Sequence, residues 1–523
     1  MTSLTLEDIG VHQNEPKMRS GTKGFIALPS VGMRNAPEIL ILELFREVFF
    51  NVDSMEQAST RELKPDMRDK DTNAYVFDKI GERATVAAFR NQRKQSQRSK
   101  MMTYYAPAYP SLAAPAWLSK KRERVIKRLL FEGAFAQHLC PQGTMGDQQK
   151  ELRDTMVDAI IASFLGTDKN IDGKQYPDIL QVAIGNSAQG IEIDESKERL
   201  KAICGSTSTV FDLPNDRLAA RIFDDFLTVC ELEKSLPRIL WVRVLMTYLR
   251  MALPMWLLAQ MRITSLVHGW LLAAIDKQSI ASELEITSSI LKRNCDLLTP
   301  TLTPTREVFS NTQEYIKCRV ELNALLYSLE ELVPDRIKNK TIRIHRSNSE
   351  SIALPELLQI AASVRARYSE YVEWQDSPSV SVFIKRHCER YRAWCNPLNS
   401  GQGKNIDEFF RVLYRAERGD EAGGYLLLRQ GRGECSGFRV FPGRLLLQTI
   451  STLAANAKRD SSEKVKGGGK LVLEDIENHF SQYGINFSLA ADARPLLMQE
   501  LQSLGLLSGS SDAGSSVAVL CPF

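Results

Sequence analysis

Apolar residues recur every three or four positions over much of the chain between residues 148 and 395. This spacing is typical of amphipathic helices that pack on a shared core. The pattern is clearest in residues 148–166, 217–236, 305–333 and 353–375. A further helix is predicted over residues 36–51, where Pro37 suits the first helical turn. The sequence therefore predicts a mainly α fold with a multidomain helical body.

The most apolar stretch, residues 251–275, has one charged residue, Arg262, and one proline, Pro254. Its length could cross a bilayer, but an arginine near the middle of a membrane helix is costly. Proline breaks the hydrogen-bond ladder of a helix. We expect a pair of buried core helices, with a membrane segment as the alternative.

The pattern changes towards the C-terminus. Residues 425–441 predict two short strands around a glycine turn. Residues 474–483 and 493–504 predict two helices, and residues 505–520 predict two strands around a polar tip. The order resembles that of a winged-helix domain, carried by Leu473, Ile476, Phe480, Tyr483, Gly484, Ile485, Leu496, Leu497, Leu501, Leu504, Gly505 and Leu506.

Winged-helix domains that bind DNA do so with the second helix, which needs basic or amide side chains. Here that helix offers Arg494, Gln499 and Gln502 beside Glu500, and the tip has Asp512 and no base. We therefore expect this module to contact protein subunits rather than read DNA.

These patterns divide the chain into five parts. They are an N-terminal α/β-like region (1–82), a basic segment with an amphipathic helix (83–147), the α-helical body (148–395), a linker with a β-hairpin (396–442) and the winged-helix-like domain (443–523). A length of 523 residues is too great for one core, which agrees with several domains.

Nine cysteines are scattered at irregular spacings without a CxxC pair, so a disulfide framework is not expected. Residues 1–14 have neither the positive region nor the apolar run of a signal peptide. We expect a cytoplasmic protein.

Charge is distributed unevenly along the chain. The net charge is +4, yet residues 83–128 contain twelve lysines and arginines against one acid, Glu123. This segment therefore carries +11 and the rest of the chain −7. Locally concentrated positive charge attracts polyanions.

Aromatic residues lie among these bases, and tyrosines can stack on unpaired bases while basic side chains neutralise phosphates. Ser119 is a candidate N-cap for a helix with Val125, Ile126, Leu129 and Leu130 on one face and bases on the other. The segment predicts a nucleic-acid interface that favours single strands. Its candidate residues are Arg90, Arg93, Lys94, Arg98, Lys100, Tyr104, Tyr105, Tyr109, Lys120, Lys121, Arg124, Lys127 and Arg128.

Two other partners fit the same charge, namely an acidic protein surface and an anionic membrane, of which the membrane is the least favoured.

Enzyme motifs are weak. Asp178, Glu195 and Lys197 loosely match the PD-ExK pattern of metal-dependent nucleases. His387, Cys388 and Cys395 do not have zinc-site spacing, so neither a metal nor a cofactor is expected.

We therefore predict a non-enzymatic nucleic-acid-binding accessory subunit of a multiprotein DNA-processing or antiviral defence system. The class of system is suggested by analogy alone. The alternatives are a PD-ExK nuclease and a protein scaffold without a nucleic-acid role.

Overall fold

The computed structural model describes residues 37–49, 91–92, 102–103, 125–139, 145–165, 168–169, 175–176, 193–204, 211–212, 217–277, 280–282, 284–286, 288–289, 297–298, 303–304, 315, 318, 352–368, 409–415, 423–430, 437–462, 471–487, 493–508 and 517–523. Most of the expected N-terminal α/β-like region lies outside these ranges. Of the predicted helix over 305–333, only Tyr315 and Cys318 are described, and both are buried.

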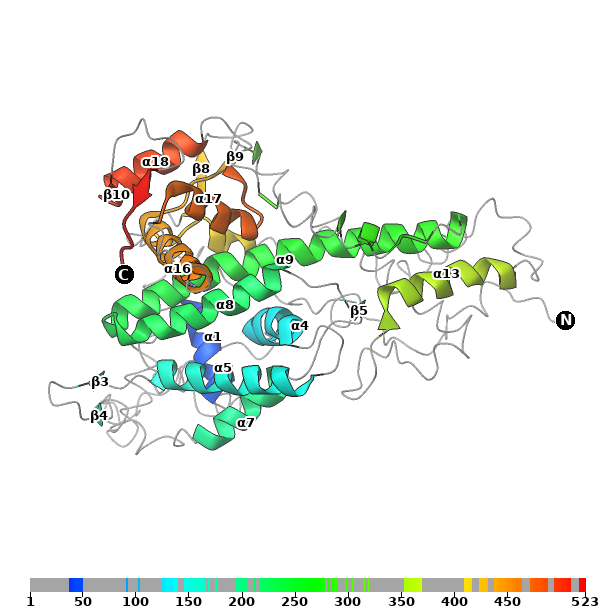
Figure 1. Ribbon diagram of the computed structural model, residues 1–523, viewed down its shortest axis with the longest axis horizontal. Helices are drawn as coiled ribbons and strands as arrows, with labels where there is room; N and C mark the ends of the chain where they lie inside the picture. Colours follow the sequence, from blue (N-terminus) through cyan, green and yellow to red (C-terminus); the bar gives the residue numbers. More distant parts are fainter. Residues whose placement is uncertain are drawn as a thin grey trace, which may run out of the picture.

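The described residues are predominantly helical, which confirms the mainly α prediction (Figure 1). The body contains α1 (Glu38–Phe49), η3 (Ile126–Phe135), α4 (Ala136–Leu139), α5 (Asp147–Leu165), α7 (Ile193–Cys204), α8 (Arg217–Glu231), η4 (Leu232–Lys234), α9 (Arg238–Lys277) and α13 (Leu354–Tyr368). Helices α1, α8 and α13 lie inside the ranges that the periodicity predicts, and α5 begins one residue before its range.

The predicted helix pair around residues 251–275 is wrong, because α9 is one helix of 40 residues with Pro254 inside it. A proline inside a helix costs about 3 kcal/mol. Burial offsets that cost: Met251, Leu253, Met255 and Trp256 are at most 2% exposed, and burying each such side chain contributes roughly 1.5–3 kcal/mol. In Figure 1, the C-terminal half of α9 extends beyond the other helices of the body, and α13 lies along that half.

Among the described helices, one is long and apolar enough to cross a membrane, and it is α9, over Arg238–Ile275. In its most apolar stretch, 89% is buried inside the protein. The neighbouring helices therefore cover these side chains, as they do in the core helix of a globular domain.

The C-terminal elements are α16 (Arg444–Ser462), α17 (Leu473–Gln482), α18 (Ala493–Ser503), β10 (Leu507–Ser508) and β11 (Ala518–Val519). Strands β10 and β11 pair antiparallel. Helix α17 begins where the Asp475 carboxylate accepts a hydrogen bond from the Val472 N–H at 2.8 Å. It ends before Gly484, whose φ of 76° suits glycine.

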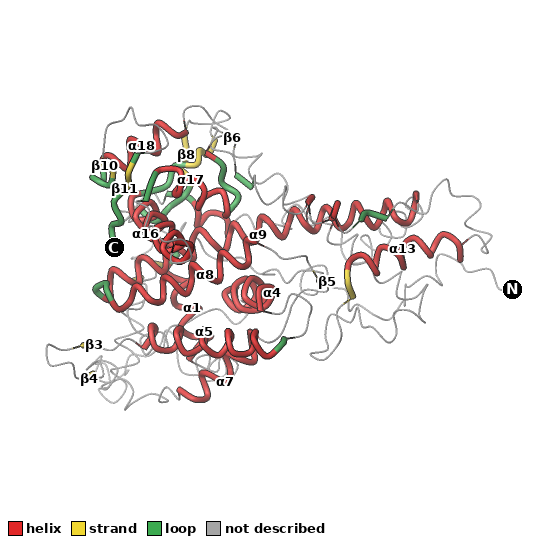
Figure 2. The backbone as a smooth tube through the Cα atoms, viewed as in Figure 1, coloured by secondary structure: helices red, strands yellow, loops and turns green. Residues whose placement is uncertain are grey.

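The predicted hairpin in residues 425–441 is present as β8 (Leu427–Gln430) paired antiparallel with β9 (Gly437–Val440). Strand β6 (Thr303–Pro304) adds to the other edge of β9, and η6 (Arg411–Leu413) leads into Tyr414, which bridges to Leu427. Figure 2 shows this small sheet beside α17.

Other described strands are two-residue pairs: β1 (Asn91–Gln92) with β2 (Met102–Thr103), β3 (Asp168–Lys169) with β4 (Gln175–Tyr176), and β5 (Phe211–Asp212) with β7 (Ile352–Ala353).

One hydrophobic core joins the early and late elements of the chain. It extends from Leu40 of α1 to Val519 of β11. Aromatic rings fill its centre, where the Phe135 ring lies 5.3 Å from that of Phe223 and 5.2 Å from that of Phe226. The C-terminal helices therefore share their core with the helical body, which differs from the expectation that a chain of this length is too long for one core.

Candidate functional site

The basic segment, residues 83–128, is the candidate nucleic-acid interface, and the structure describes its hairpin strands and its C-terminal end. Strands β1 and β2 pair Asn91 with Thr103 and Gln92 with Met102. Nine residues, 93–101, connect these strands, and the sequence places four bases and no acid among them. The four bases therefore lie in sequence between two strands that pair with each other.

Most of the predicted interface residues lie outside the described residues. They are Arg90, Arg93, Lys94, Arg98, Lys100, Tyr104, Tyr105, Tyr109, Lys120, Lys121 and Arg124. The remaining two, Lys127 and Arg128, are on η3, and the side chain of Arg128 is not described.

The segment is fixed to the body through η3. As predicted, Val125, Ile126, Leu129 and Leu130 are buried, at most 1% exposed. The element differs from the expected α-helix because Ile126–Phe135 is a π-helix, in which hydrogen bonds join residues five apart. The burial also reaches beyond one face, since Phe131, Ala134 and Phe135 are covered as well.

Lys127 lies on the more open side of η3. Its Nζ is 3.5 Å from Glu132 Oε1, and its side chain is 28% exposed. A partly exposed ion pair of this kind contributes about 0–1 kcal/mol to stability. Among the described residues, Lys127 is therefore a partly exposed base of the candidate interface that already has an acidic partner.

The residues of the nuclease alternative do not form the expected arrangement. Asp178 lies outside the described residues, and Glu195 and Lys197 are on helix α7 rather than on a strand. Glu195 pairs with Arg199 at 2.7 Å, and Lys197 pairs with Asp158 of α5 at 2.6 Å. This partner raises the pKa of Lys197 through a hydrogen bond and its negative charge, which opposes any role for Lys197 as a neutral base.

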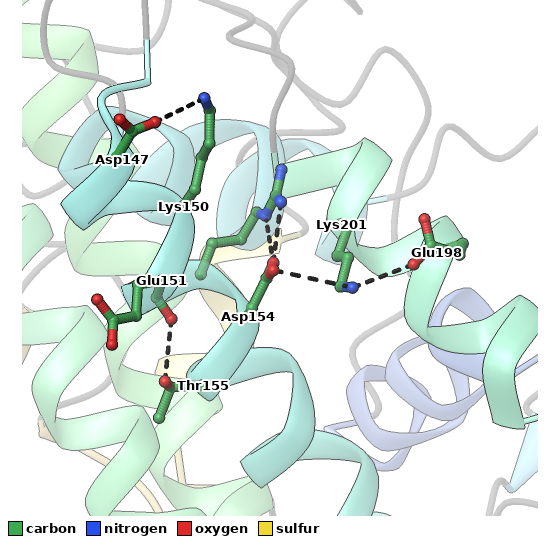
Figure 3. A network of polar contacts seen from close by, with 8 residues as sticks. Asp147, Lys150, Glu151, Asp154, Thr155, Glu198 and Lys201 are labelled. Atoms are coloured by element: carbon green, nitrogen blue, oxygen red, sulfur yellow. Dashed lines mark hydrogen bonds and ion pairs between the residues drawn. The ribbon is translucent and has the colours of Figure 1, made fainter.

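A separate surface network also joins α5 and α7 (Figure 3). Asp154 pairs with Arg153 at 2.9 Å and faces Lys201, which pairs with Glu198 at 3.0 Å. Within the described part of the chain, no group of three or more His, Cys, Asp or Glu side chains could hold a metal ion. The possible zinc ligands His387, Cys388 and Cys395 are not among the described residues.

A buried polar cluster at the junction of α8 and α17 was not predicted from the sequence. Asp225 Oδ2 lies 2.8 Å from His479 Nε2 and accepts a hydrogen bond from the Tyr483 hydroxyl at 2.7 Å. The other oxygen, Oδ1, lies 2.8 Å from the Arg221 guanidinium. Nearby, the Tyr248 hydroxyl donates to the Ile222 carbonyl at 2.6 Å.

Electrostatics in this cluster favour the ionised carboxylate. Burial raises the pKa of Asp225, but the opposing effects of His479, Arg221 and the Tyr483 hydroxyl outweigh it and hold that pKa below its ordinary value. Burial and the Asp225 charge raise the pKa of Tyr483 well above its ordinary value, so this hydroxyl stays protonated and donates.

The cluster is closed to solvent, because Asp225 and Tyr483 are fully buried and His479 is 2% exposed. A substrate cannot reach these groups in this conformation. The Asp225 cluster therefore joins two distant parts of the chain and has a structural role. The sequence offered one weak signal, since Tyr483 belongs to the winged-helix-like pattern, but nothing in it links residue 479 to residue 225.

The second helix of the C-terminal module, α18, has one basic residue, Arg494, and its guanidinium lies 3.1 Å from Glu477 of α17. Its exposed positions include the uncharged side chains of Pro495, Gln499, Gln502 and Ser503. The described surface of α18 thus has little to attract a phosphate backbone.

Comparison of the chain with protein-family models, with curated proteins and with solved structures finds no match.

Proposed function

We propose that this protein is a non-enzymatic subunit that binds nucleic acid through its basic segment, residues 83–128, and contacts other protein subunits through a C-terminal winged-helix module. The observation that carries the proposal is the paired strands β1 and β2, whose nine-residue connection has four bases and no acid. A short connection with this charge suits the phosphates of a nucleic-acid strand.

The winged-helix assignment is the finer part of the proposal. It is supported by the order of α16, α17, α18, β10 and β11 and by the antiparallel pairing of the two strands. The ion pair between Arg494 and Glu477 favours protein contact over DNA reading by α18. A cytoplasmic location fits the buried free thiols of Cys204, Cys230 and Cys318.

Binding of a fluorescently labelled single-stranded oligonucleotide, followed by anisotropy at increasing salt, tests the proposal. Five engaged phosphates on a single strand give a log-log salt slope of roughly −3.5, at about 0.7 per contact. Replacement of Arg93, Lys94, Arg98 and Lys100 by glutamate should abolish binding and leave the thermal midpoint nearly unchanged, because solvated charges contribute little to stability.

A matched control makes the same change in net charge elsewhere, by glutamate substitution of the exposed residues Lys150, Arg217, Lys234 and Arg243. This control should retain most of the binding. If the wild type binds no oligonucleotide at low salt, or if the control loses as much affinity as the test variant, the proposed interface is wrong.

A further inference from the structure

A second group of basic residues surrounds the small sheet formed by β6, β9 and β8. Residues 409–447 contain seven arginines, no lysine and four acids, a surplus of three positive charges. All four acids, and also Arg418 and Arg432, lie outside the described residues. Arg411, Arg415, Arg429 and Arg444 are exposed and Arg439 is half-buried.

The strand register places two of these arginines on the same face of the sheet. Tyr414 pairs with Leu427, and Leu428 pairs with Arg439. Since side chains alternate along a strand, Arg415, Leu428 and Arg439 share one face. Leu427 lies on the opposite, buried face. Neighbouring strands are about 4.8 Å apart, so the backbones of Arg415 and Arg439 are separated by about 10 Å.

A third arginine, Arg444, lies at the rim of this face, and Tyr425 connects it to Arg415. The Arg415 guanidinium lies over the Tyr425 ring, 5.7 Å from its centre. The Tyr425 carbonyl accepts a hydrogen bond from the Gly443 N–H at 2.8 Å, which places the backbone of the next residue, Arg444, near the backbone of Tyr425. We call Arg415, Arg439 and Arg444 the arginine face. They come from three segments that backbone hydrogen bonds hold together.

The same register leaves Arg429 on the other side of the sheet. It pairs directly with Phe438, which is 4% exposed and faces the core. Arg429 is itself exposed, at the end of β8. It therefore provides a matched control: an arginine in the same sheet, with the same charge, that points away from the arginine face.

The chemistry of this surface favours phosphate groups. A guanidinium presents a planar fork of N–H donors that binds two phosphate oxygens at once, which the ammonium of lysine cannot do. Arg439 lies in β9, Arg415 follows the residue that bridges to β8, and Arg444 begins α16. Hydrogen bonds anchor the segment before Arg415, because the buried Arg250 of α9 donates to the carbonyls of Val412 and Tyr414. Little ordering is therefore needed on binding.

We infer that the arginine face is a second contact for the nucleic-acid strand, in which Arg415, Arg439 and Arg444 bind consecutive backbone phosphates. This inference rests on the proposed function, since it assumes that the chain binds nucleic acid, but it assigns a surface more than 280 residues away in the sequence from the basic segment. Contacts of this kind hold the backbone and are independent of base sequence.

The test uses the full chain and a labelled oligodeoxythymidylate, with salt titrations of three variants. Substituting glutamine for Arg415, Arg439 and Arg444 removes three phosphate contacts. It should make the salt slope shallower by about 2 and weaken binding roughly tenfold or more at low salt. Arg429→Gln should change the salt slope by less than the contribution of about half a phosphate contact. Lysine at the same three positions should restore the slope, because the charges return.

The outcomes separate this inference from the proposed function. If the triple glutamine variant binds like the wild type while reversal of Arg93, Lys94, Arg98 and Lys100 abolishes binding, the arginine face is wrong and the proposed function stands. If the glutamine variant loses binding while the reversal variant retains it, the arginine face stands and the basic segment is wrong. An equal loss with Arg429→Gln overturns the assignment of the face, and a wild type that binds no oligonucleotide overturns both.

Discussion

Replacing Asp225 by alanine should selectively destabilise the junction of α8 and α17. The substitution removes the acceptor of the His479 and Tyr483 contacts and the counter-charge of Arg221. Asp225 and Tyr483 are fully buried, so water cannot replace the lost partner without local opening. Removing one member of a buried charged pair costs about 3–5 kcal/mol.

Hydrogen exchange followed by mass spectrometry measures this cost where it occurs. A loss of 3–5 kcal/mol in the local opening free energy of α17 (Leu473–Gln482) corresponds to exchange roughly 100 to 5,000 times faster, at about 1.4 kcal/mol per factor of ten. Asp225→Asn keeps one oxygen acceptor and should give a smaller effect. The matched control is Asp224→Asn, at the adjacent, exposed position, which should stay within about 0.5 kcal/mol of the wild type.

The pH dependence follows from the depressed pKa of Asp225. A carboxyl whose pKa is lower in the folded state stabilises the protein fully above its ordinary value of 3.8 and loses that stabilisation as pH falls towards the folded-state value. The difference in α17 exchange between wild type and Asp225→Ala should therefore shrink below pH 3.8. Equal α17 exchange in Asp225→Ala and Asp224→Asn at neutral pH would refute the reasoning.

Two further predictions concern single positions. Gly423 and Gly505 both have positive φ, 68° and 69°. The Cβ of alanine at Gly505 would meet open space, so this variant should lose about 1–2 kcal/mol of stability for the backbone conformation alone. The Cβ of alanine at Gly423 would lie 2.7 Å from the Arg444 backbone nitrogen, so this variant should lose clearly more. The denaturant midpoints of the two variants check this order. Among the thiols, burial raises the pKa of Cys230 to about 12, whereas Cys521 is exposed. Alkylation at pH 8 followed by peptide mapping should therefore find Cys521 modified long before Cys230. Comparable rates at the two cysteines would contradict the burial of Cys230.

Much of the fold was predictable because short-range patterns determine it. The apolar spacing located α1, α5, α8 and α13, and the glycine turn located the β8–β9 hairpin. The continuity of α9 was missed, because Arg262 and Pro254 interrupt the apolar pattern locally, whereas the burial that stabilises one long helix comes from distant helices.

The site was less predictable for a related reason. Charge counting found the basic segment from adjacent residues, whereas Asp225 and His479 meet only in three dimensions. The arginine face likewise depends on which residues pair across strands, and a shift of one residue in that register would separate Arg439 from Arg415.

The separation of Asp225 and His479 has a consequence for synthesis of the chain. The two residues are 254 positions apart, and a ribosome adding about 5–20 residues per second needs roughly 13–50 s to cover that distance. During this interval α8 has been made but the helix that seals its carboxylate has not. The nascent body therefore has an incomplete interface on the ribosome, a surface that a chaperone could shield until the last helices emerge.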